Sequence, residues 1–74
     1  MNWDQMEGKW KQMKGSARER WAKFSADDLE FIGGKKDKLV GKIQEHYGRS
    51  KEEAENEADS WCHDCERQHD HVTH

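Results

Sequence analysis

The sequence predicts an all-α fold: a small domain of four helices, built from two similar helical hairpins and followed by a disordered C-terminal tail. Three observations favour this class. The chain has no proline, its apolar residues recur at spacings of three and four, and helix-capping signals recur along it. A chain of 74 residues stands near the lower limit of independent folding, which leaves room for one domain. We expect that domain over residues 1–62 and the tail over residues 63–74.

The first expected helix is amphipathic and about twenty residues long. Asn2 precedes it as a capping residue, and Gln5, three positions later, completes a capping box. Residues at helical spacing form one apolar stripe: Trp3, Met6, Trp10, Met13, Ala17, Trp21 and Phe24.

Three further helices are expected after the first. Ser25 with Asp28 forms a second capping box and begins a short helix that ends at a pair of glycines. The third helix ends at Gly48, and Ser50 with Glu53 begins the fourth. Residues 8–23 and 34–49 resemble each other, with four identities in sixteen positions, which favours two similar hairpins packed together. Their predicted shared core consists of Trp10, Trp21, Leu29, Ile32, Leu39, Ile43 and Trp61.

Glycines recur every seven residues, which returns them to nearly the same helical face. Gly8 and Gly15 lie opposite the apolar stripe, where an interior glycine destabilises a helix by about 1 kcal/mol relative to alanine. The core does not require them. Three interpretations remain open: a neutral weak point, a smooth face for a partner, or a helix that is kept marginally stable.

Charge is divided unevenly along the chain. Residues 1–51 carry a balance of +4 and residues 52–74 a balance of −7, within a net charge of −3. We favour an acidic last helix that lies across basic earlier helices. The alternative is a basic nucleic-acid-binding face with an acidic tail.

The C-terminal stretch WCHDCERQHDHVTH holds both cysteines and four of the five histidines. The candidate metal ligands are Cys62, Cys65, His69 and His71, because two thiolates and two imidazoles suit tetrahedral zinc. One cysteine pair with a loose histidine tract lacks the two rigid half-sites of a strong zinc motif. We therefore predict a solvated tail and no metal or other cofactor. Nearby carboxylates also disfavour a reactive thiolate.

The segment IGGKKDKL, residues 32–39, is similar to the phosphate-binding turn of helix-hairpin-helix domains. Lys35, Lys36 and Lys38 are therefore the candidate contacts to a nucleic-acid backbone, although any exposed turn between helices shows the same residue types. The sequence contains no nucleophile elbow and no phosphate-cradling loop, and so short a chain offers little concave interior. We predict that the protein is not an enzyme.

Several segments match the pattern of one known family. They are NWDQMEGKWKQMKG at residues 2–15, GKKDKLVGKIQEHYG at residues 34–48 and AENEAD at residues 54–59, together with the positions Trp21, Asp28, Ile32 and Trp61. In these residues the chain closely resembles the CsbD-like family of small bacterial general stress-response proteins. The resemblance covers about residues 2–61 and implies a small helical fold without assigned catalytic residues. The family's glycine content and hydrophilicity also resemble those of hydrophilins.

Two functional classes follow from these features. The first is a non-enzymatic stress-response protein that protects macromolecular clients through weak contacts. The second is a small binding module for nucleic acid or protein that uses the basic first three helices. No apolar run is long enough for a signal peptide or a membrane span, so we expect a cytoplasmic protein that does not enter the membrane. We also expect a monomer.

Overall fold

The computed structural model describes the backbone of residues 2–72 and the side chains of residues 2–65. Five helices cover most of the chain: α1 (Trp3–Gly8), α2 (Trp10–Arg20), α3 (Ala26–Ile32), α4 (Lys36–Tyr47) and α5 (Lys51–Val72). Residues 2–72 contain no strand. The predicted all-α class is therefore confirmed.

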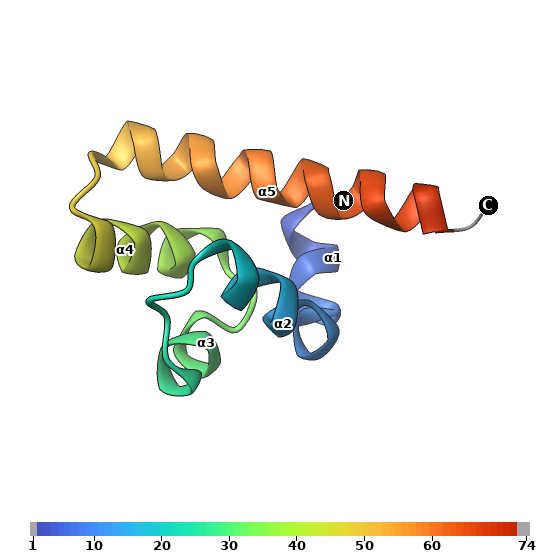
Figure 1. Cartoon of the computed structure of the whole chain (residues 1–74), viewed down its shortest axis with the longest axis horizontal. Coiled ribbons are helices and arrows are strands. Elements are labelled where there is room, and N and C mark those ends of the chain that lie inside the picture. The colour runs from blue at the N-terminus through green and yellow to red at the C-terminus, as the bar shows by residue number, and fades with distance from the viewer. Residues whose placement is uncertain (1, 73–74) are drawn as a thin grey trace.

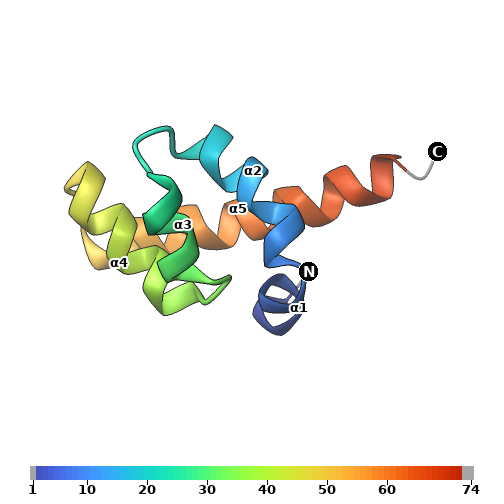
Figure 2. The same cartoon turned by 90° about the horizontal axis from the view of Figure 1, so that it is seen from below.

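The helices form two layers. The long helix α5 runs along one side of the molecule, and α1 to α4 lie beneath it (Figure 1). Seen from below, α5 passes behind α2, α3 and α4 (Figure 2). The 22 residues of α5 correspond to about 33 Å of helix, which is most of the molecule's longest dimension of 38 Å. Helix α5, the second helix of the second predicted hairpin, also reaches the first hairpin, where Trp61 contacts Trp3 and Trp10.

The predicted helix ends are confirmed by their hydrogen bonds. The side chain of Asn2 accepts a hydrogen bond from the N–H of Gln5 at 2.8 Å. Ser25 and Ser50 cap α3 and α5 in the same way, each at 3.1 Å. Gly33 and Gly48 end α3 and α4 in the left-handed conformation, with φ values of 56° and 63°.

The first predicted helix is wrong in one respect, because the structure divides it into α1 and α2 at Lys9. Lys9 has φ −108° and ψ 13°, outside the helical range. The break allows the rings of both Trp3 and Trp10 to reach Trp61, at centroid distances of 6.4 and 6.0 Å. A change at one residue leaves the spacing of apolar residues intact, so periodicity could not reveal it.

The core lies between α5 and the layer beneath it. All seven residues predicted for the core are buried. Trp61 is central, since its ring also meets that of Trp21 at 5.4 Å in an edge-to-face arrangement. The remaining apolar residues of the core are Met6, Ala17, Phe24, Val40, Ala54, Ala58, Cys62 and Cys65.

Every tryptophan indole N–H has an acceptor, which fixes the orientation of the rings. The acceptors are Asp59 for Trp3, the Leu29 carbonyl oxygen for Trp10, Glu57 for Trp21 and the Ser16 hydroxyl for Trp61. Three of these four bonds join α5 to the lower layer. A buried tryptophan is most stable when its N–H is satisfied, so these bonds help to specify the position of α5.

The predicted boundary between the domain and the tail is wrong at residues 63–65. Helix α5 does not end at Cys62, because its backbone continues to Val72. Cys65 is buried, so at least this part of the expected tail belongs to the core. A thiol packs as a small apolar group, so the apolar face of α5 extends as far as Cys65. The remainder of the expected tail, residues 66–74, lies outside the residues whose side chains the structure describes.

Candidate functional surface

The candidate metal ligands fall in two groups. Cys62 and Cys65 lie on α5 and are buried against the core. The side chains of His69 and His71 lie outside the described residues. Among the residues that are described, no group of three or more histidines, cysteines and carboxylates is placed to hold a metal ion.

The Cys65 thiol is enclosed rather than presented to solvent. Burial raises the pKa of the Cys65 thiol, and a contact of 3.7 Å with the Ser16 hydroxyl offsets only part of this effect. The charge of Asp64 raises the pKa further. A higher pKa leaves less thiolate at neutral pH, which makes the thiol a poor nucleophile and a poor metal ligand in this state.

The three candidate nucleic-acid lysines have different environments. Lys36 forms an ion pair with Asp59 on α5 at 3.0 Å. Lys38 lies over the ring of Phe31, with its Nζ atom 5.0 Å from the ring centroid. Lys35 is exposed and occupies the N-cap position of α4, where no side chain caps the helix. The structure therefore commits Lys36 to a contact between helices and does not gather all three lysines for one ligand.

The acidic helix α5 does lie across basic residues of the preceding helices and loop. The ion pair of Lys36 with Asp59 is one link, and the pair of Arg49 with Glu57 is a second. Trp21 donates to the other oxygen of the Glu57 carboxylate. The favoured interpretation of the charge pattern is confirmed for these residues.

A cluster of polar side chains around Asp28 joins α3 to α4. The Asp28 carboxylate accepts hydrogen bonds from the Ser25 N–H at 2.9 Å and lies 3.1 Å from the Lys42 Nζ atom. The His46 ring nitrogen Nε2 lies 2.8 Å from the same carboxylate. These bonds, above all that from the Ser25 backbone, hold the pKa of Asp28 well below its usual range. The sequence identified Asp28 as a capping residue but gave no sign of its contacts with α4.

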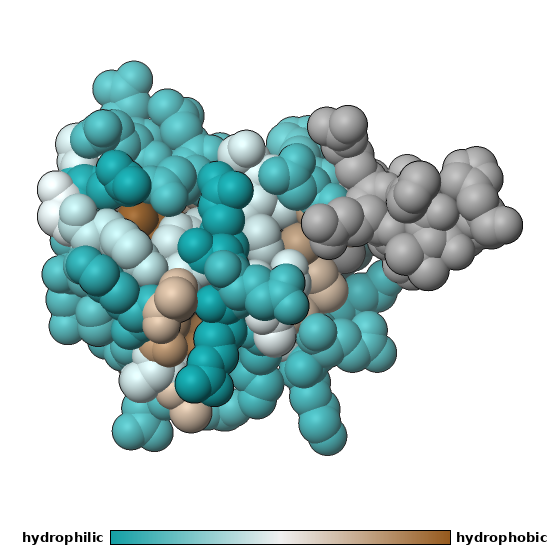
Figure 3. All heavy atoms as spheres, viewed as in Figure 1, coloured by the Kyte–Doolittle hydropathy of each residue, from teal (hydrophilic) through white to brown (hydrophobic). Residues whose placement is uncertain are grey.

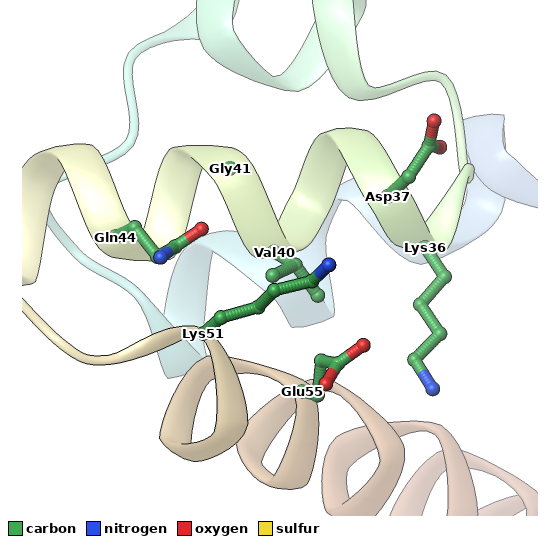
Figure 4. Close-up of a pocket in the computed structure, with 7 residues that line it drawn as sticks. All are labelled: Lys36, Asp37, Val40, Gly41, Gln44, Lys51 and Glu55. Carbon is green, nitrogen blue, oxygen red and sulfur yellow. The ribbon is translucent and has the colours of Figure 1, made fainter.

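A shallow hollow lies between α4 and α5, and we call it the α4–α5 hollow (Figure 4). Its volume is about 440 Å³, and Val40 and Gln44 of α4 face Lys51 and Glu55 of α5 across it. Lys36 lines the end near its ion pair with α5. The lining holds both signs of charge, so the hollow has no net preference for an anion or a cation.

A second hollow of about 330 Å³ lies on the adjacent face of α4, next to Phe31 of α3. We call it the Phe31 surface; its lining residues are Phe31, Asp37, Lys38, Gly41, Lys42 and Glu45. Gly41 lines both hollows. A β-carbon added at Gly41 would meet nothing within 4 Å, so the missing side chain leaves a bare strip of backbone between them.

The glycines divide into two kinds. Gly34 is required by the fold, because a β-carbon there would lie 2.7 Å from the Cα atom of Glu7 and the residue has a φ of 83°. Gly8, Gly15 and Gly41 are helical, and a β-carbon at each would meet nothing within 4 Å. The prediction that the core does not require Gly8 and Gly15 is confirmed.

The outer surface is almost entirely polar. Hydrophilic residues cover most of the face seen in Figure 3, with small apolar areas between them. In the described part of the chain, no helix is long and apolar enough to cross a membrane. These features define a class: a small, highly charged helical protein with shallow hollows on its surface.

Comparison with known proteins places the chain within that class. The sequence pattern of the CsbD-like family matches residues 4–56, so the chain belongs to this family of bacterial stress-response proteins. It is 52% identical over 71 residues to the UPF0337 protein YjbJ of Escherichia coli O6:H1, covering 96% of this chain and 97% of that protein. It is 57% identical over 61 residues to the UPF0337 protein ECA0631 of Pectobacterium atrosepticum, covering 82% and 88%. No solved structure shows significant similarity to the chain.

Proposed function

We propose that the protein acts without catalysis in the bacterial cytoplasm, where it protects other macromolecules under stress through weak contacts, as hydrophilins are thought to do. One observation carries the proposal. Gly15 and Gly41 occupy exposed faces of α2 and α4, where the surrounding structure would accept a side chain. The fold therefore does not explain these two glycines.

The two glycines lower the stability of the helices that contain them. Each destabilises its helix by about 1 kcal/mol relative to alanine, and small domains are stable by only about 5–15 kcal/mol in total. Local opening of α2 and α4 is correspondingly easier. A helix that opens easily can adapt its charged surface to differently shaped clients, which suits weak and unselective contact.

The charge of the surface supports the same function. Charged residues make up 39% of the chain, and three of the six described ion pairs lie largely at the surface. Such pairs contribute little to stability, about 0–1 kcal/mol each, and exchange readily with solvent or with a client. The two hollows along α4 are open and shallow, unlike the enclosed and largely apolar sites that bind small substrates.

A drying assay tests the proposal. A desiccation-sensitive reporter enzyme is dried and rehydrated with increasing amounts of this protein, or with an inert globular protein at equal mass. We expect more activity to survive with this protein, and to see the difference at mass ratios near one. Survival equal to that given by the inert protein would contradict the proposal.

A further inference from the structure

Phe31 is unusual on so polar a surface. It is the one large apolar side chain that is exposed among residues 2–65, and 55% of its surface is accessible. Its neighbours on α3, Leu29 and Ile32, are buried and account for the packing of that helix. The core therefore does not explain why an aromatic residue occupies position 31.

Two lysines of α4 lie against the Phe31 ring. The Nζ atoms of Lys38 and Lys42 are 5.0 and 5.1 Å from the ring centroid. Lys42 is also held by the carboxylates of Asp28 and Glu45, at 3.1 and 3.3 Å. Within the described residues Lys38 has no carboxylate partner, so its charge is available to a ligand.

The space beside the ring is open down to the backbone of α4. The hollow holds about 330 Å³, and Gly41 forms part of its floor without a side chain. The site therefore combines an exposed aromatic ring, an ammonium group without a carboxylate partner, and open space beside Gly41. A ligand that uses all three must present a planar face close to a negative charge.

We propose that the Phe31 surface binds single-stranded nucleic acid. A base stacks on the ring of Phe31, and the adjacent phosphate contacts the Nζ atom of Lys38. Proteins that bind single strands without sequence preference combine these two elements, an aromatic platform and cations beside it. An apolar protein segment would make no use of the ammonium group, and an acidic peptide would make no use of the ring.

The acidic residues of the surface set a limit on the affinity. Glu45 is paired with Lys42, but Asp37 lines the hollow and repels phosphate. Binding is therefore weak and sensitive to salt, with a logarithmic slope of about −0.7 for each phosphate neutralised on a single strand. It does not depend on the protective function proposed above, because stacking on Phe31 requires no opening of α2 or α4.

The test is a titration of a fluorescent oligothymidylate, followed by anisotropy at low salt. Phe31→Tyr keeps a stacking ring and should bind as the natural protein does. Phe31→Leu keeps an apolar side chain without a ring and should bind about tenfold more weakly, or worse. Because Phe31 is exposed, both variants should retain the helical circular dichroism spectrum and the thermal midpoint.

Two further measurements separate the contribution of charge to binding from that of base stacking. Lys38→Gln should weaken binding and reduce the salt slope by about 0.7, whereas Lys51→Gln, an equal loss of charge at the α4–α5 hollow, should change neither. An oligomer of abasic sites should bind as weakly to the natural protein as oligothymidylate binds to Phe31→Leu.

Three results would overturn the proposal. The first is equal binding of abasic and thymidylate oligomers, which would mean that charge alone acts. The second is full binding by Phe31→Leu. The third combines two observations: oligothymidylate does not bind, and an unfolded, carboxymethylated protein binds equally well to the natural protein and to Phe31→Leu. This result would assign the surface to apolar protein segments.

Discussion

Replacing Gly15 and Gly41 by alanine should stabilise the protein. At both positions an added β-carbon meets nothing within 4 Å, and neither residue has the positive φ that would strain alanine. Each change therefore yields the full difference in helix propensity, about 1 kcal/mol. The positions lie on different helices, so the two effects should add to about 2 kcal/mol. For a domain of this size that corresponds to a thermal midpoint about 8–16 °C higher.

Gly34→Ala provides a matched control of opposite sign. Its β-carbon would lie 2.7 Å from the Glu7 Cα atom and 2.9 Å from the Met6 carbonyl oxygen, and its φ is 83°. The left-handed conformation alone costs alanine about 1–2 kcal/mol, and displacement of α1 adds to it. Urea unfolding followed by tryptophan fluorescence gives the free energies of unfolding of the natural protein, the double variant and Gly34→Ala. An unchanged or lower stability in the double variant, with the helical spectrum retained, would refute the reasoning.

Further predictions concern three other residues. Trp21→Ala should lower the free energy of unfolding by about 3–5 kcal/mol and abolish most of the cooperative thermal transition, because this ring is 1% exposed; a transition that survives unchanged would remove Trp21 from the core. Asp28→Asn should cost about 2 kcal/mol at neutral pH in urea titrations. The folded pKa of Asp28 is lowered, so its contribution to the free energy of unfolding is present above the unfolded pKa and is lost as pH falls through the folded pKa. The difference in stability between the natural protein and the variant should therefore shrink below about pH 4. A difference that does not change with pH would contradict the lowered pKa. Because burial raises the pKa of Cys65, its alkylation by iodoacetamide, mapped by mass spectrometry, should be slow near neutral pH and fast in denaturant; equal rates in both conditions would show that the thiol is not enclosed.

Much of the fold follows from local sequence signals. The capping boxes at Asn2 and Ser25 and the glycines that end α3 and α4 act within one helical turn, so they can be read from the chain without knowledge of its packing. The spacing of apolar residues likewise identified the buried faces. These signals determine which residues are helical and which side of each helix is buried.

The remaining features depend on contacts between distant parts of the chain. The division at Lys9 serves the approach of Trp3 and Trp10 to Trp61, more than fifty residues away from Trp3. The contact of Asp28 with Lys42 and His46 depends on how α3 packs against α4. Neither arrangement leaves a mark in local spacing or propensity.

The candidate surface could likewise be predicted only in part from the sequence. The sequence marked Lys38 as a possible phosphate contact, because lysines at the start of a helix are easily recognised. It did not single out Phe31, since an aromatic residue beside Ile32 in a short helix is ordinarily assigned to the core. The pairing of Lys36 with Asp59 was also hidden, because it joins residues of different helices.

The most direct test of the protective function combines the drying assay with the glycine variant. The natural protein and the Gly15→Ala, Gly41→Ala double variant have the same charge and the same exposed side chains apart from two methyl groups, so they differ mainly in helix stability. If adaptable helices provide the protection, the double variant should preserve less reporter activity at equal mass while unfolding at a higher temperature. Equal protection by the two proteins, with the expected rise in thermal midpoint, would contradict the claim that marginal helix stability is what makes this protein protective.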